Sequence, residues 1–167
     1  NIGQLARIGY AEFRGGNSTE QLVGMDIVMN RVESDKFPNT IEGVIKQPWQ
    51  FSSLNKNDNN RIFYTNPSET LKIQSGKHKG ELDKLNHNAW VRSLSNAIKV
   101  YKGSERGISK SALLYYSPRS MSRDKNGNPT IPKWDFNKLK EIYVAGVRPS
   151  YIKMYTYKES KKKGQRK

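Results

Sequence analysis

The chain of 167 residues contains no cysteine, so disulfide bonds and thiolate chemistry are both excluded. It has two histidines, His78 and His87, which lie apart in a stretch with few other metal ligands. A zinc site needs clustered His, Cys or carboxylate side chains. We therefore expect neither a bound metal nor a cofactor.

Long apolar runs are also missing. No segment approaches the roughly 18 consecutive apolar residues that a membrane-spanning helix requires, and the amino terminus lacks the charged-then-apolar pattern of a signal peptide. No internal repeat or interdomain linker is visible, and the length is that of one domain with a real core. The sequence predicts one folded domain without a membrane span.

Acidic residues are scarce: 15 Asp and Glu stand against 30 Lys and Arg, a formal net charge of +15. Such a field attracts polyanions. Nucleic acid is one candidate partner, although no helix-turn-helix, zinc-finger or RNP-type motif is present, so no specific nucleic acid is indicated. Bacterial cell-wall polymers carry carboxylates and often phosphates, and they satisfy the same charge argument. The basic residues in 159–167 are predicted to form a solvated, flexible tail after a domain at 1–158.

Helical periodicity dominates the first two thirds of the chain. Helices are predicted over residues 2–14, over 18–34, in a short segment after Thr40, in another that begins at Asn66 and Pro67, and over 88–102. Ser18 with Gln21 is predicted to cap the second helix. The stretches 52–60 and 74–86 are polar and are predicted to be loops.

Strand patterns come late. Residues 112–116 and 151–157 are predicted to be strands, and the pair Asn126-Gly127 indicates a turn between them. Helices early and a few strands late are typical of an α+β domain.

Glu12 is the principal candidate for catalysis. It stands near the end of the first predicted helix, just ahead of Gly15 and Gly16. A carboxyl group on the last turn of a buried helix is partly withdrawn from water, which raises its pKa toward the range of a general acid. The alternative, which is the commoner one for an isolated glutamate, is a solvated helix residue.

Four segments stand around and after Glu12 in a characteristic order. They are Tyr10-Ala11-Glu12-Phe13-Arg14-Gly15-Gly16, Val28-Met29-Asn30-Arg31-Val32, Phe37-Pro38-Asn39-Thr40-Ile41-Glu42-Gly43-Val44-Ile45 and Gln50-Phe51-Ser52. In order and spacing they resemble the SleB/CwlJ-type cell wall hydrolases. Three later segments resemble that family more loosely: Ala112 to Ser117, Pro132-Lys133-Trp134 and Tyr151 to Tyr155.

The chain departs from the family pattern at several positions. Phe13 replaces a residue that is usually small, and Gly16 replaces the usual second glutamate. Tyr115-Tyr116-Ser117 lacks the histidines common in that strand, and Ser150 or Tyr151 stands where the last histidine often is. These departures bear on substrate contacts and leave the glutamate of the motif in place.

The resemblance implies a lysozyme-like, mostly helical domain that cleaves the glycan strand of peptidoglycan between N-acetylmuramic acid and N-acetylglucosamine. Family members act as lytic transglycosylases, which implies that Glu12 serves as both acid and base. A muramidase-type hydrolase is the alternative, because Glu20, Asp26, Glu33 or Asp35 could supply the second carboxylate that hydrolysis requires. A non-catalytic peptidoglycan-binding module and a nucleic-acid-binding protein are further alternatives.

Other site residues follow from the same motifs. Gln50 and Ser52 are predicted to hydrogen-bond to acetamido or hydroxyl groups of the sugar. Four aromatic residues are predicted to offer flat faces to sugar rings, with core packing as the alternative for each: Phe51, Tyr115, Tyr116 and Tyr155. Asn30 and Arg31 are predicted to brace the Glu12 turn or the loop after it without touching substrate. Trp49, Trp90 and Trp134 are assigned to the core, Trp134 near the cleft edge.

The resemblance also implies a place of action, the bacterial cell wall, and we expect a monomer there. Fifteen asparagines and twenty lysines in a compact basic chain resemble a phage lysin. A spore or vegetative bacterial enzyme is the alternative.

Overall fold

The structure is a computed structural model that describes residues 1–48 and 50–158. Trp49 and the predicted tail at 159–167 lie outside the described residues. The elements follow in the order α1 (Ile2–Phe13), α2 (Ser18–Glu33), α3 (Ile41–Ile45), η1 (Ser52–Leu54), α4 (Arg61–Thr65), α5 (Pro67–Thr70), α6 (Lys84–Tyr101), β1 (Leu114–Tyr116), η2 (Pro118–Ser120), η3 (Phe136–Lys138), β2 (Leu139–Ile142) and β3 (Lys153–Tyr157). A mostly helical chain with a small late sheet confirms the predicted α+β class.

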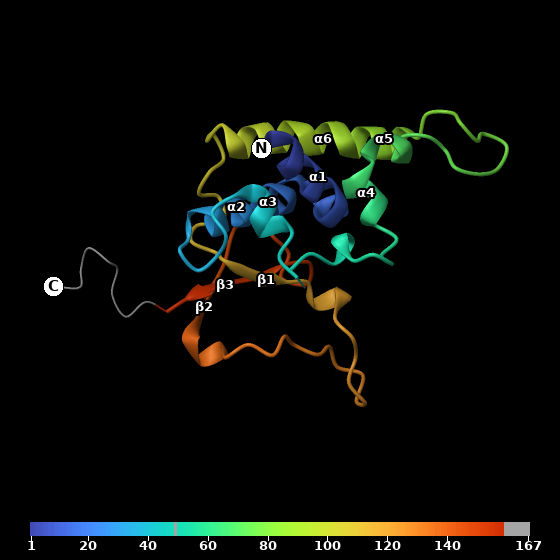
Figure 1. The fold of residues 1–167 in the computed structure, drawn as a ribbon. Coiled ribbons are helices and arrows are strands. Elements are labelled where there is room, and N and C mark those ends of the chain that lie inside the picture. Colours follow the sequence, from blue (N-terminus) through green and yellow to red (C-terminus); the bar gives the residue numbers. More distant parts are fainter. Residues whose placement is uncertain (49, 159–167) are drawn as a thin grey trace.

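The helices form a layer that lies on the sheet (Figure 1). Helix α1 packs against α2, α4 and α6, and α6 crosses the side of the layer opposite the sheet. The sheet has strand order β1-β3-β2 and is antiparallel throughout. Tyr155 of β3 pairs with Leu114 of β1 on one side and Glu141 of β2 on the other.

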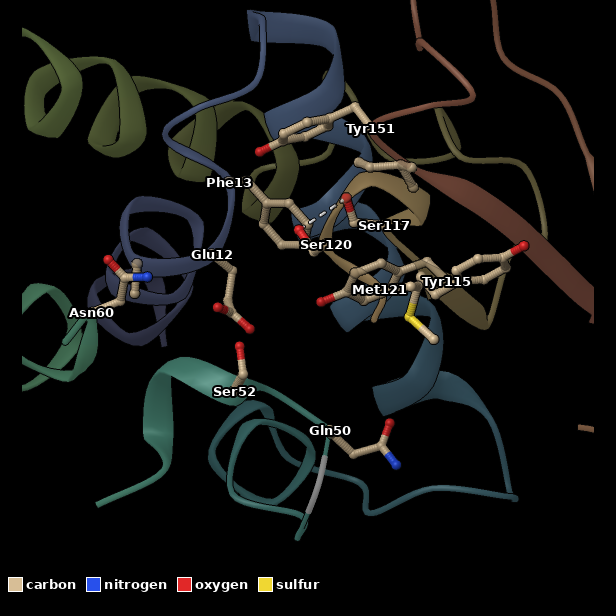
Figure 2. Close-up of a pocket in the computed structure, with 13 residues that line it drawn as sticks. Glu12, Phe13, Gln50, Ser52, Asn60, Tyr115, Ser117, Ser120, Met121 and Tyr151 are labelled. Carbon is tan, nitrogen blue, oxygen red and sulfur yellow. Dashed lines mark hydrogen bonds between the residues drawn. The ribbon is translucent and has the colours of Figure 1, made fainter. Parts of the chain in front are cut away.

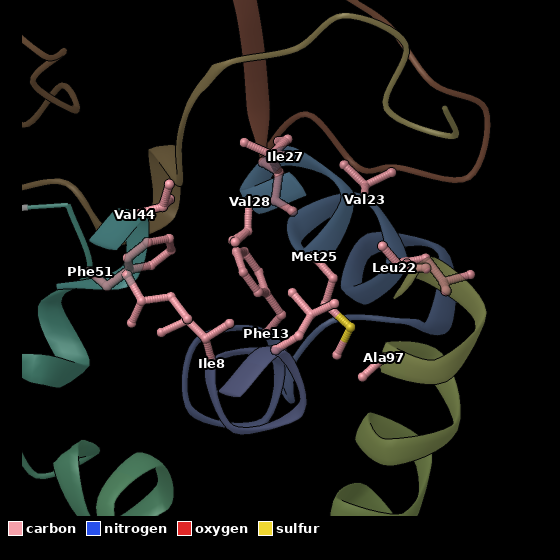
Figure 3. Close-up of a cluster of buried hydrophobic side chains, with 14 of the residues drawn as sticks. Ile8, Phe13, Leu22, Val23, Met25, Ile27, Val28, Val44, Phe51 and Ala97 are labelled. Carbon is pink, nitrogen blue, oxygen red and sulfur yellow. The ribbon is translucent and has the colours of Figure 1, made fainter. Parts of the chain in front are cut away.

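Helix α2 is the centre of the domain. Residues 20–28 are all buried, so this helix is covered on every side, as expected of a helix enclosed by other elements. Its apolar side chains, among them Val23 and Val28, meet Ile8 and Phe13 of α1 and Ala97 of α6 in one cluster (Figure 3). The core therefore fixes the end of α1, where Glu12 lies, against α2.

Buried polar side chains of α2 are hydrogen-bonded, as burial requires. Gln21 donates from Nε2 to the carbonyl of Gly9 at 3.1 Å and to Oγ of Ser93 at 2.7 Å. Its Oε1 accepts from Nδ2 of Asn96 at 2.8 Å. This network ties α1, α2 and α6 together through their polar groups.

Some predicted boundaries need correction. Asn17, not Ser18, caps α2: its side chain accepts from the N–H of Glu20, whose carboxylate accepts from the N–H of Asn17. Helix α6 begins at Lys84, within the predicted loop, because Asp83 caps it by accepting from the N–H of Asn86 at 3.0 Å. Helix α4 and strand β2 were not predicted. No helix in the described part of the chain is both long and apolar enough to cross a bilayer.

Candidate active site

A cleft of about 380 Å³ opens at the carboxyl end of α1, between η1 and the start of the sheet (Figure 2). It is lined by Ala11, Glu12, Phe13, Gln50, Ser52, Asn60, Tyr115, Tyr116, Ser117, Ser120, Met121, Tyr151 and Ile152. The lining residues come from five separate parts of the chain, so the cleft exists only in the folded domain. Glu12 is the one acidic residue among them.

Glu12 lies on the last turn of α1 and is partly buried. Burial raises the pKa of its carboxyl group, because the charged form loses water, and the charge of Asp58 raises it further. The hydroxyl and N–H of Ser53 and the N–H of Ser52 act in the opposite direction. In Figure 2 the carboxylate points toward the hydroxyl of Ser52. The net upward shift is that of a general acid.

Arg14 fixes the end of α1 beside Glu12. Its Nη1 donates to the carbonyls of Tyr10 at 3.3 Å and Ala11 at 3.0 Å, so it satisfies groups that the helix end leaves without partners. Its Nη2 donates to Oδ1 of Asn60 at 2.7 Å, and its guanidinium lies 3.6 Å from the ring centre of Phe63. Arg14 thereby holds Asn60 at the cleft wall.

Two tyrosine hydroxyls belong to the Glu12 environment. Burial raises the pKa of Tyr115 and of Tyr151, and the negative charge of Glu12 contributes to both shifts. Both phenols therefore stay neutral O–H groups at working pH. The Tyr151 ring also packs near two guanidinium groups, at 4.7 Å from Arg119 and 5.2 Å from Arg148. Tyr151 was noted in the sequence only as a departure from the family, not as a site residue.

The remaining predicted aromatics divide into two groups. Tyr116 lines the cleft, whereas Tyr155 is 7% exposed and lies outside it. Tyr155 stacks parallel to Tyr116 at 6.3 Å, and Trp134 contacts both rings edge-on. This corrects the expectation that Tyr155 presents a face to sugar: its ring is covered by the rings of Tyr116, Trp134 and Phe136.

Phe51 needs the same correction. It is 2% exposed, belongs to the core and does not line the cleft. The guanidinium of Arg31, also buried, lies 5.8 Å from the Phe51 ring centre and 5.8 Å from that of Tyr115. Arg31 donates from Nη1 to Oε1 of Gln50 at 3.0 Å, which orients this cleft residue. Ser52 lies on the rim and is exposed.

Asn30 and Arg31 brace the segment that leads into β1, and none of their hydrogen bonds within the described residues reaches the Glu12 turn. Asn30 donates to the carbonyl of Ala112 at 2.8 Å and to Oγ of Ser109 at 3.0 Å. Arg31 donates from Nε to the carbonyl of Leu113 at 2.7 Å. Both side chains thus place β1 and, through it, Tyr115.

The carboxylates considered as partners of Glu12 are occupied elsewhere. Glu20 pairs with Arg148 at 2.7 Å, while Arg106 pairs with both Asp26 and Glu33. Asp35 is exposed, and none of the four lines the cleft. Asp58 is the acidic residue whose charge reaches Glu12, and nothing in the local sequence marks it.

No cluster of three or more His, Cys, Asp or Glu side chains that suits a metal occurs within 1–48 and 50–158. His78 contacts Glu81 at 2.7 Å on the surface, away from the cleft. Trp90 is half-buried and packs 5.2 Å from the ring centre of Tyr10, consistent with its assignment to the core.

Known proteins resemble this chain in sequence and in fold. A family model described as Cell Wall Hydrolase matches residues 16–144, so Glu12 lies just before the matched range. Two spore cortex-lytic enzymes from Bacillus cereus are each 34% identical over 86 residues, 52% of this chain and 29% of the relative. The chain thus matches less than a third of those relatives' length. The catalytic domain of the germination-specific lytic transglycosylase SleB from Bacillus anthracis shares the fold, with a TM-score of 0.55, 20% identity and 93% of each chain covered.

Proposed function

Because the chain belongs to the cell wall hydrolase family, we propose that it is a lytic transglycosylase that cleaves peptidoglycan between N-acetylmuramic acid and N-acetylglucosamine, with Glu12 as acid and base. The observation that carries this proposal is Glu12 itself. Among the described residues it is the one carboxyl group that lines the cleft, and burial raises its pKa. The relatives named as lytic enzymes of spore cortex and as a lytic transglycosylase support the substrate class.

The reaction requires one proton to be delivered and one to be removed. Protonated Glu12 donates to the glycosidic oxygen as the bond from that oxygen to C1 of the muramic acid breaks, and the sugar passes through an oxocarbenium-like state. The resulting Glu12 carboxylate then accepts the proton of the muramic acid's own 6-hydroxyl, whose oxygen bonds to C1. The products are a 1,6-anhydro end and a free N-acetylglucosamine end. Neither water nor a second carboxylate is consumed.

The other cleft residues have proposed roles in holding the sugar. Gln50, fixed by Arg31, and Ser52 supply hydrogen bonds to acetamido or hydroxyl groups. Tyr116 offers a ring face, backed by Tyr155. Neutral phenols at Tyr115 and Tyr151 stay available to donate hydrogen bonds near the reacting centre. In this proposal the protein acts on its substrate at the bacterial cell wall, as a monomer. The same place of action applies whether the enzyme is encoded by a phage or by a bacterium.

The decisive test combines one substitution with product analysis. Glu12→Gln keeps the shape of the side chain and removes the proton transfer, so cleavage of purified walls should fall by about 100- to 10,000-fold. Glu81→Gln, a change at an exposed glutamate outside the cleft, is the matched control and should keep full activity. Mass spectrometry of the products should find muropeptides one water lighter than hydrolytic ones, which borohydride does not reduce.

Two results would contradict the proposal. Reducible ends throughout would identify a hydrolase, with Asp58 as the first candidate for the second carboxylate. Wall binding without cleavage by the unmodified protein would identify a binding module instead.

A further inference from the structure

A second cavity, here called the basic pocket, lies beside the cleft and shares no residue with it. It measures about 460 Å³ and is lined by Arg7, Lys46, Leu54, Arg61, Tyr64 and Thr65. The short helix η1 separates the two: its first residue, Ser52, lines the cleft, and its last, Leu54, lines the basic pocket. Likewise, Asn60 lines the cleft, and its neighbour Arg61 lines the basic pocket.

Three cationic side chains from three helices meet in the basic pocket. Arg7 comes from α1, Arg61 is the first residue of α4, and Lys46 follows α3. Lys46 pairs with Glu42 at 2.7 Å. Within 1–48 and 50–158, Arg7 and Arg61 form neither an ion pair nor a side-chain hydrogen bond. Arg7 and Arg61 thus bring two positive charges to the pocket in addition to the Lys46–Glu42 pair, and an anion there would be attracted to them.

Tyr64 supplies a neutral donor to the same pocket. Tyr64 is 8% exposed as a whole residue, and its hydroxyl forms no hydrogen bond with the described residues. Burial raises the pKa of Tyr64, the charges of Lys46 and Arg7 act to lower it, and the charge of Glu42 acts to raise it, so both cations and the carboxylate paired with Lys46 lie within electrostatic reach of the phenol. The hydroxyl reaches the surface of the pocket without a protein partner, so it is free to donate to a bound acceptor.

We propose that the basic pocket binds an anionic oxygen group, a phosphate or a carboxylate, carried by the cell-wall polymer. Arginine forks bind both groups in a two-pronged manner, and the phenol of Tyr64 adds a directed O–H donor. The identity of the polymer rests on the proposed function, whereas the anion chemistry rests on the pocket alone. Binding there would hold the wall polymer on one side of η1 while Glu12 acts on the glycan in the cleft on the other side.

The first experiment titrates the isotope-labelled protein with inorganic phosphate and follows its backbone amide resonances. We expect saturable shifts centred on Arg7, Arg61 and Tyr64. The double variant Arg7→Gln/Arg61→Gln should bind phosphate at least about ten-fold more weakly, as expected when charge-assisted hydrogen bonds are lost. Lys99→Gln/Lys102→Gln removes the same net charge from exposed positions on and next to α6 and should bind like the unmodified protein.

Two outcomes of this titration would overturn the proposal. One is an equal loss of affinity in both double variants, and the other is a set of shifts spread evenly over the basic surface. Thermal unfolding of each variant checks its fold. Tyr64→Phe, which removes only the hydroxyl, provides a second and milder variant whose affinity for phosphate should also fall.

A second experiment identifies the source of the anion by sedimentation with purified walls, in the Glu12→Gln background so that the walls stay intact. If phosphates are bound, the advantage of the unmodified pocket over Arg7→Gln/Arg61→Gln should vanish on walls stripped of phosphate polymers with hydrofluoric acid. If carboxylates are bound, the advantage of the unmodified pocket should persist on the stripped walls and vanish on walls whose carboxylates have been amidated with a carbodiimide. Equal binding of both forms to untreated walls would refute the wall as the source. The phosphate titration stays decisive even if Glu12 proves not to be catalytic.

Discussion

The ring of Tyr151 occupies the space in which a side chain on Gly16 would begin. A Cβ atom at position 16 would lie 3.0 Å from Cζ of Tyr151 and only 2.7 Å from its Cε2, and the shorter distance is one that real Cβ atoms essentially never show. Where the resemblance implies a second glutamate at position 16, this chain therefore has a glycine packed against the ring of Tyr151, which itself lines the cleft. The glycine at position 16 and the tyrosine at position 151 therefore form one packing arrangement.

Phe13 and Gly24 form a second such pair, on the core side of Glu12. A Cβ on Gly24 would meet the Phe13 ring at 2.5 Å, so the large residue at position 13 depends on a missing side chain in α2. Gly24→Ala should destabilise the domain, because overpacking a full core costs about 1 to 3 kcal/mol and exceeds the gain of at most about 1 kcal/mol in helix propensity.

Urea unfolding measures this effect. Gly3→Ala is the matched control, since Gly3 is exposed at the start of α1 and its Cβ would meet only Oδ1 of Asn1 at 3.4 Å. An unchanged or raised unfolding free energy for Gly24→Ala would show that the ring moves aside without cost.

Tyr151→Phe keeps the ring beside Gly16 and removes the hydroxyl from the cleft. If the phenol donates a hydrogen bond near the reacting centre, kcat should fall by up to about ten-fold, the value of one hydrogen bond. KM and thermal stability should change little. Tyr143→Phe, at a tyrosine that is 66% exposed, is the control. Full turnover in Tyr151→Phe would reduce the role of Tyr151 to filling the cleft wall.

The sequence was sufficient to place Glu12, because apolar periodicity and the Gly15-Gly16 pair define the end of α1 without tertiary information. It was not sufficient for Phe51 or Tyr155, because the sequence does not show whether an aromatic side chain near a motif lines the cleft or is buried by other residues. Helix α4 escaped prediction because it has five residues and no side-chain cap. Asp58 was missed for a different reason: its effect on Glu12 arises only when the chain folds back over 46 residues.

Glu20 illustrates how a plausible catalytic carboxylate becomes a structural one. It is fully buried, which alone would raise its pKa, yet hydrogen bonds from Arg148 and from the N–H of Asn17 lower that pKa to about 2. The stability that this group contributes is therefore fully present above the ordinary value of 4.5 and is lost as the pH falls toward 2.

Glu20→Gln should accordingly lower the free energy of unfolding at neutral pH, by an amount on the order of 1 to 3 kcal/mol for hydrogen bonds to a charged group, and the melting temperature should fall with it. It should also flatten the decline of melting temperature on the acid side of pH 4.5. Arg148→Gln and the double variant complete a cycle in which the effects should be less than additive. Strict additivity would mean that the pair at 2.7 Å contributes nothing to stability.

Asp58 gives the sharpest test of how the site works, because its charge acts on the pKa of Glu12. Burial raises that pKa first and Asp58 adds to the rise. A general acid must be protonated, so activity should decline on the alkaline side as the pH passes the pKa of Glu12. Removing the negative charge in Asp58→Asn lowers this pKa and should move the alkaline limb of kcat/KM to lower pH, with the maximal rate retained. Asp35→Asn, at an exposed aspartate that lies away from the cleft, should leave the profile unchanged.

A uniform loss of about 100-fold or more at every pH in Asp58→Asn would instead indicate that a general base is missing. That result would make Asp58 the second carboxylate of a hydrolase, and reducible product ends should then accompany it.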